Sequence, residues 1–135
     1  MTFFLDACAL IAYINQEPEG PQVKALIERA GSGEDIICMS VVNLAEVYYH
    51  CIKRDGEEMA DTIMHNAAEL PITVIDTITD AVCRETARFK AHYPMSLADA
   101  FLCAAAKSLS AVIVTKDREI ETAEKPENLS VFWIH

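Results

Sequence analysis

The sequence has no apolar run that approaches the roughly 20 residues of a membrane-spanning helix. The apolar segment Phe3-Phe4-Leu5 ends at Asp6 and has no basic residue before it, so it does not have the pattern of a signal peptide. We therefore expect no membrane association and a cytoplasmic location. The sequence also lacks internal repeats, low-complexity tracts and linkers. With 52% hydrophobic residues, this predicts one domain over residues 1–135.

Paired cysteines and spaced histidines, which build most zinc sites, are also missing. The five cysteines are odd in number and contain no C-x-x-C pair, and the four histidines show no ligand spacing. A disulfide framework and a zinc site are therefore disfavoured, and we expect buried, reduced thiols.

Basic residues are scarce, with 11 Lys and Arg against 21 Asp and Glu, which gives a formal charge of −10. This balance disfavours a general nucleic-acid-binding surface. It remains compatible with a nuclease whose metal ions and local basic groups meet the phosphate, and it suits a basic partner protein.

Short β-rich runs alternate with helical patterns along the whole chain, which is typical of an α/β fold with a parallel sheet. We predict a doubly wound sheet of four to five strands with helices on both faces. The expected strands are residues 2–5, 36–39, 72–75, 112–114 and 131–134. The expected helices are residues 7–15, 22–30, 40–54 with Ser40 as its N-cap, 57–69, 79–92 and 96–109, followed by a short segment at 118–123.

Four acidic residues fall where such a sheet would gather them. Asp6 ends the first strand, Asp117 comes shortly after the fourth, and Glu46 and Asp99 lie near the starts of two helices. If the first and fourth strands are neighbours, Asp6 and Asp117 emerge side by side at the carboxyl edge. Crowded carboxylates repel and are tolerated mainly around a divalent cation. The pattern predicts a Mg²⁺ or Mn²⁺ site that acts on a phosphate-bearing substrate.

Each acid also has an ordinary explanation. Asp6 and Asp117 are suitable helix caps, and Asp99 follows Ser96 in the S-x-x-D pattern of a capping box. Glu46 could be a solvated glutamate, although its helical neighbours include Val42 and Tyr49. The joint pattern favours the metal site, with the hydroxyl groups of Thr115 and Ser40 as supporting groups.

Four segments in this order resemble the PIN-domain family and, within it, the VapC-type toxins of toxin–antitoxin modules. Together they cover nearly the whole chain. They are Phe3-Phe4-Leu5-Asp6 with Leu10-Ile11-Ala12, Ser40-Val41-Val42-Asn43-Leu44-Ala45-Glu46-Val47, Ser96-Leu97-Ala98-Asp99-Ala100, and Val114-Thr115-Lys116-Asp117.

The resemblance implies an endoribonuclease in which a metal-activated water attacks an RNA phosphodiester in line and leaves 5′-phosphate and 3′-hydroxyl ends. Asp6, Glu46 and Asp99 match the three core acids, and Asp117 matches a fourth. The family often has a polar residue just after the first Asp, where this chain has Ala7 and Cys8. A homodimer and a cognate antitoxin are also implied.

Basic residues that could contact RNA phosphates form two sets. Arg84 and Arg88 are four residues apart on one predicted helix, and Lys116 and Arg118 flank Asp117. Positive charge near the C-terminus of a helix also suits the helix dipole, so both explanations of the first set stay open.

Three other functions remain open at this stage. The chain could be a PIN nuclease for RNA processing outside a toxin module or a PIN fold kept only as a binding scaffold. It could also be a receiver-like signalling module in which Asp76 is the phosphoacceptor.

Overall fold

The computed structural model describes residues 1–135 and contains one five-stranded sheet, in the order β3-β2-β1-β4-β5. All neighbouring strands pair in parallel. The predicted parallel α/β architecture is therefore confirmed. The strands are β1 (Thr2–Leu5), β2 (Ile36–Ser40), β3 (Thr73–Ile75), β4 (Val112–Thr115) and β5 (Val131–Trp133).

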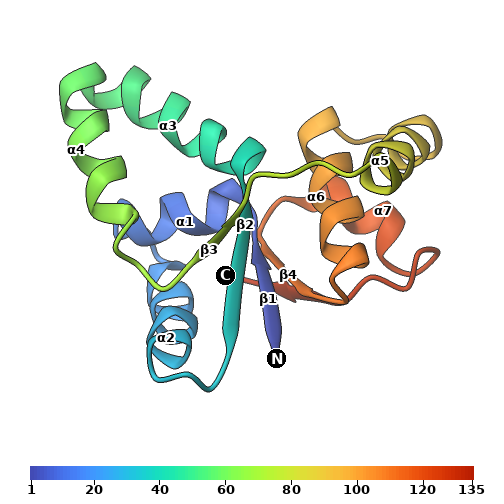
Figure 1. The fold of residues 1–135 in the computed structure, drawn as a ribbon, viewed down its shortest axis with the longest axis horizontal. Coiled ribbons are helices and arrows are strands. Elements are labelled where there is room, and N and C mark those ends of the chain that lie inside the picture. Colours follow the sequence, from blue (N-terminus) through green and yellow to red (C-terminus); the bar gives the residue numbers. More distant parts are fainter.

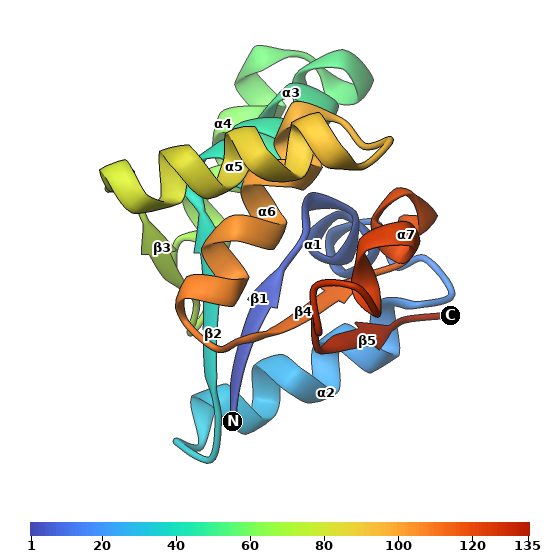
Figure 2. The same cartoon turned by 90° about the vertical axis from the view of Figure 1, so that its right-hand side faces the viewer.

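Helices cover both faces of the sheet, as predicted, because each parallel crossover has to return the chain over one face. The first four helices lie on one side of the sheet and the last three on the other (Figures 1 and 2). The helices are α1 (Ala7–Ile14), α2 (Gly20–Gly31), α3 (Val41–Asp55), α4 (Glu57–Ala67), α5 (Asp80–His92), α6 (Leu97–Ser108) and α7 (Glu121–Glu124), with a 3₁₀ turn, η1 (Arg118–Ile120), before the last.

The central strand β1 contributes to two separate apolar cores. Phe3 and Leu5 pack in the core beneath the first helices, whereas Phe4 packs in the core beneath α6. Successive side chains of a strand point to opposite faces, so a strand covered on both faces is apolar throughout. This explains why residues 3–5 form a continuous apolar run.

Local capping chemistry sets most element boundaries. The side chains of Ser40, Thr79 and Ser96 accept backbone N–H groups at the starts of α3, α5 and α6. Gly56, with φ of 88°, separates α3 from α4. The predicted helix limits differ most from the observed ones at α4 and α2. Helix α4 ends at Ala67 rather than at residue 69, and α2 begins at Gly20 rather than at residue 22.

No helix of the structure has both the length and the apolar character needed to cross a membrane.

Candidate metal centre

The adjacency of β1 and β4 brings Asp6 to Thr115. Leu5 pairs with Val114 in the register of the two strands, and the chain continues from these residues at the same edge of the sheet. The Thr115 hydroxyl donates a 2.7 Å hydrogen bond to Oδ2 of Asp6, and Ala7 N–H donates one of 2.7 Å to Oδ1. Asp6 is therefore both the cap of α1 and a fixed, buried member of the site.

Asp99 is placed by the first turn of α6. Its backbone N–H donates to Oγ of Ser96 over 3.1 Å, which is one half of a capping box. The other half is absent, because Ser96 N–H donates to Glu119 instead, over 3.2 Å. The Asp99 carboxylate is consequently not used for capping. Its Oδ2 is buried and has no hydrogen-bond partner.

Asp117 lies between β4 and η1. Its Oδ1 accepts the N–H of Glu119 over 3.0 Å, and its own N–H donates to Oγ1 of Thr115 over 2.9 Å. Capping therefore explains part of the geometry of Asp117, as it does for Asp6. Neither role prevents the remaining carboxylate oxygen from facing the other acids.

Asp6, Asp99 and Asp117 form one tight group, in which one carboxylate oxygen from each residue lies within 4.8 Å of the others. Glu46 is outside this group but close enough for Asp6 and Asp117 to raise its pKa. Its Oε1 accepts a hydrogen bond of 3.1 Å from Asn43 Nδ2. Asn43 in turn accepts a 2.7 Å hydrogen bond from the Ser40 hydroxyl, so Ser40 supports Glu46 indirectly.

The electrostatics of the group favour a bound cation. Burial raises the pKa of Asp6, and burial with the neighbouring carboxylates Glu119, Asp117 and Asp6 raises that of Asp99 to about 8. Burial also raises the pKa of Glu46. These carboxylates resist ionisation together, and a divalent cation removes that penalty.

Cys8 occupies the place where the sequence suggested a missing polar contact. Its Sγ lies 3.6 Å from Oδ2 of Asp6 and 3.4 Å from Oγ1 of Thr115, and it accepts the N–H of Lys116 over 3.5 Å. Burial, with the charge of Asp6, raises the pKa of this thiol to about 12, so it stays neutral. Asp6 therefore keeps its support through Thr115 and the thiol.

The basic residues predicted to contact substrate all have carboxylate partners. Arg84 pairs with Asp80, and Arg88 donates to Glu85 and Glu127. Lys116 pairs with Glu17 and Glu19, and Arg118 pairs with Glu121 and stacks on Trp133.

Sequence reasoning missed two residues of the site. Glu119 joins the start of α6 to Asp117, and Asn43 holds Glu46. The position of Asn43, three residues after Ser40 and three before Glu46 on one helix, is the signal that could have identified it.

A model of the PIN domain family matches residues 3–126 of the chain. No match is found among curated protein sequences. The family prediction made from the four sequence segments is confirmed.

Several solved structures share this fold. VapBC2 from Rickettsia felis, bound to a DNA fragment from its promoter, has a TM-score of 0.80 at 17% identity, with 100% of both chains covered. DNA-bound VapBC from Salmonella typhimurium has a TM-score of 0.73 at 20% identity, with 98% of this chain and 97% of the other covered. VapC20 from Mycobacterium tuberculosis, a sarcin-ricin loop cleaving toxin, has a TM-score of 0.70 at 15% identity, with 90% and 94% covered.

Proposed function

The chain belongs to the PIN domain family, and from this premise we propose that it is a metal-dependent endoribonuclease and the toxin of a toxin–antitoxin pair. The observation that carries the proposal is the group of three carboxylates whose oxygens lie within 4.8 Å of one another. The toxin assignment is supported by the shared fold of the VapC and VapBC structures.

The donor set fits Mg²⁺ or Mn²⁺. Carboxylate oxygens are the ligands that hard divalent cations prefer, and no histidine or thiolate is among them. The unpartnered buried Oδ2 of Asp99 is the strongest single sign, since such an atom needs a cation or a donor. We propose Asp6, Asp99 and Asp117 as ligands, with Glu46 as a fourth that reaches the ion directly or through water.

Hydrolysis joins a water oxygen to phosphorus and breaks the bond to the 3′ oxygen, which leaves as a hydroxyl and gives a 5′-phosphate. A bound Mg²⁺ or Mn²⁺ supplies Lewis acidity toward the phosphate oxygens and lowers the pKa of water. Asp6, fixed by Thr115 and Ala7, and Asp99, fixed by the start of α6, hold the reacting groups in register.

We propose Glu46 as the acceptor of the proton of the attacking water. It is the exposed acid of the four, Asn43 holds its Oε1, and its raised pKa brings it closer to neutral pH.

The test is cleavage of total cellular RNA with Mg²⁺ or Mn²⁺ by the wild type, Asp6→Asn and Asp99→Asn. We expect cleavage that EDTA abolishes and that both substitutions reduce at least about 100-fold. Asp76→Asn is the matched control, because Asp76 also follows a strand but lies outside the acid group. Undiminished cleavage by Asp99→Asn, or none by folded wild type on any RNA, would reject the assignment.

The partners are part of the same proposal. An apolar groove of about 460 Å³ on α3 and α4 supports contact with another protein chain, an antitoxin or a second copy. It is lined by Val41, Leu44, Ala45, Tyr48, Tyr49, Ile52 and Met64.

We expect a homodimer in light scattering of the isolated chain. Co-expression with the gene adjacent to its own should relieve growth arrest, whereas arrest that no neighbouring gene relieves favours an RNA-processing role.

The substrate contacts predicted for Arg84, Arg88, Lys116 and Arg118 stay predictions. Each would have to exchange a carboxylate partner for an RNA phosphate.

A further inference from the structure

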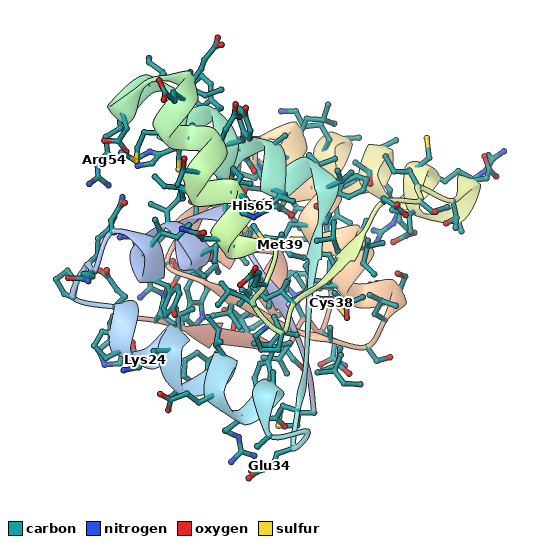
Figure 3. The ribbon with its side chains drawn as sticks, turned by 60° about the vertical axis from the view of Figure 1, so that its left-hand side comes forward. Lys24, Glu34, Cys38, Met39, Arg54 and His65 are labelled. Carbon is teal, nitrogen blue, oxygen red and sulfur yellow. The ribbon has the colours of Figure 1, made fainter.

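One face of α3 leads away from the acid group. Glu46, His50 and Arg54 are spaced at i, i+4 and i+8 on this helix, so they lie along one face. Each step of four residues advances about 6 Å, which is comparable with the separation of successive phosphates on a single strand. Arg54 lies at the end of α3 farthest from the sheet (Figure 3).

Asn15, which caps the end of α1, connects His50 and Arg54. Its Nδ2 lies 3.2 Å from Nε2 of His50, and its Oδ1 accepts a hydrogen bond from Nη1 of Arg54. Asn15 Nδ2 also donates to Glu17 over 3.4 Å, and Glu17 accepts from Lys116, the neighbour of Asp117. Side chains from α1, α3 and the segment after β4 therefore meet in one network, which Lys116 connects along the chain to Asp117.

The charge of Arg54 is less neutralised than that of most other arginines in the chain. Arg29, Arg84 and Arg88 each donate to a carboxylate at 2.6 to 2.8 Å. Arg54 has the neutral Asn15 as its hydrogen-bonded partner, and its nearest carboxylate oxygen, on Asp55, is 3.7 Å away. Its side chain is 52% exposed, so its remaining donors can reach a ligand.

We propose that Arg54 and His50 bind the backbone phosphates of the RNA strand that enters the metal centre, and that Asn15 is the positioning residue that holds both. This inference rests on the proposed ribonuclease function and adds the path of the substrate. In a chain with net charge −10, the Arg54 guanidinium supplies the attraction that the acid group lacks. The guanidinium fork suits phosphate oxygens, and the amide fixes its direction.

The test is binding of a fluorescent, mixed-sequence single-stranded RNA, measured in the Asp99→Asn background to prevent cleavage. We expect Arg54→Ala to raise the Kd about 5- to 10-fold and to reduce the slope of log Kd against log salt by about 0.7. His50→Ala should raise the Kd about 2- to 3-fold. Asn15→Ala should weaken binding less in an Arg54→Ala background than alone, which a purely structural role would not produce.

Lys53→Ala is the matched control, since it removes the same charge from the adjacent residue, whose ammonium group lies over Tyr49 on another face of the helix. It should change the Kd less than 2-fold. Arg54→Gln serves as a second variant if Arg54→Ala lowers the unfolding temperature.

The outcomes separate this inference from the proposed function. If the Arg54→Ala, Arg54→Gln and Lys53→Ala proteins bind RNA equally well, the proposed path of the RNA strand along α3 is wrong. Metal-dependent cleavage by the wild type would still leave the ribonuclease assignment standing. No cleavage by the wild type, together with no RNA binding in the Asp99→Asn background, would reject both.

Discussion

At the scale of single residues, Asp99 carries a structural cost at the position proposed to bind the metal ion. The residue is 6% exposed, and its carboxylate has one unpartnered oxygen and faces three other acids. An isolated buried charge of this kind destabilises a fold unless a cation or a proton neutralises it. Without metal, the proton has to do so.

The first prediction concerns the pH dependence of stability without metal. The pKa of Asp99 is about 8 in the folded protein and has its usual value of 3.8 when unfolded. The folded state therefore holds this proton more tightly. The contribution of Asp99 is most favourable below pH 4 and is lost as the pH rises toward 8. In EDTA, we expect the ionisation of Asp99 to lower the Tm by on the order of 5 °C as the pH rises from 5 to 8.

Asp99→Asn is the control for this prediction, because the amide has the same shape and does not titrate. The variant should be more stable than the wild type at pH 8 in EDTA, and the difference should vanish near pH 4. Parallel Tm curves for the two proteins over this range, measured by circular dichroism, would contradict the argument.

The site shows which residues a sequence can reveal and which it hides. Asp6, Asp99 and Asp117 were predictable because each stands at the end of a strand or the start of a helix, where parallel topology collects side chains. Glu119 was not, and neither was the contact of Cys8 with Thr115, because these contacts join residues 23 and 107 positions apart. Such contacts depend on side-chain directions that no local pattern encodes.

At the scale of elements, the start of α3 couples stability to the site. Ser40 caps the helix by accepting the N–H of Asn43, and the Asn43 side chain binds both the Ser40 hydroxyl and Glu46. Ser40 and Asn43 are fully buried. The same few hydrogen bonds therefore begin the helix and hold Glu46 beside the acid group.

The second prediction tests this coupling. Asn43→Ala leaves the Ser40 hydroxyl without its acceptor and frees Glu46, so it should cost about 2 kcal/mol of stability. It should also raise the Mn²⁺ concentration for half-maximal RNA cleavage several-fold. Thr79→Ala, which removes the cap of α5, should cost about 1 kcal/mol and leave the Mn²⁺ dependence unchanged. Urea unfolding and a metal titration measure both effects, and a normal Mn²⁺ dependence of Asn43→Ala would refute the coupling.

Helix α5 holds two arginines, Arg84 and Arg88, that the sequence offered equally as phosphate contacts. Their surroundings in the structure differ. Arg88 donates to both oxygens of Glu127, whose side chain is 10% exposed and also accepts from Tyr93 and Lys107. These contacts hold the pKa of Glu127 well below its usual range. Arg84 pairs only with Asp80 of its own helix, and both side chains are 79% exposed.

The third prediction follows from that contrast. Arg88→Gln leaves a largely buried carboxylate without its main partner and should destabilise the protein by about 2–3 kcal/mol. Arg84→Gln should change the stability by less than about 0.5 kcal/mol. Urea unfolding at pH 7 measures both. If the Arg88→Gln protein is as stable as the wild type but binds RNA more weakly, Arg88 is a phosphate contact, as the sequence also allowed.

At the scale of the whole molecule, the strand order could be inferred only in part. The alternation of strands and helices predicted a parallel sheet, and the hypothesis that β1 and β4 are neighbours is confirmed. The positions of β3 and β5 at the two edges were not predictable, since these strands have only three residues each and are partly exposed. Burial patterns in the sequence distinguish central strands from helices better than they order the edges.

The fourth prediction separates a specific ion from general screening of the charge of −10. Added KCl should raise the Tm of the wild type and of an Asp6→Asn/Asp99→Asn double variant alike, because salt screens repulsion between all the acids. Mg²⁺ at the same ionic strength should raise the Tm of the wild type further, since an ion at ten times its Kd adds about 1.4 kcal/mol to stability. The double variant should show no such extra rise. Equal responses to Mg²⁺ in the two proteins would mean that the acid group binds no ion and that the penalty of its buried carboxylates is relieved by protonation alone.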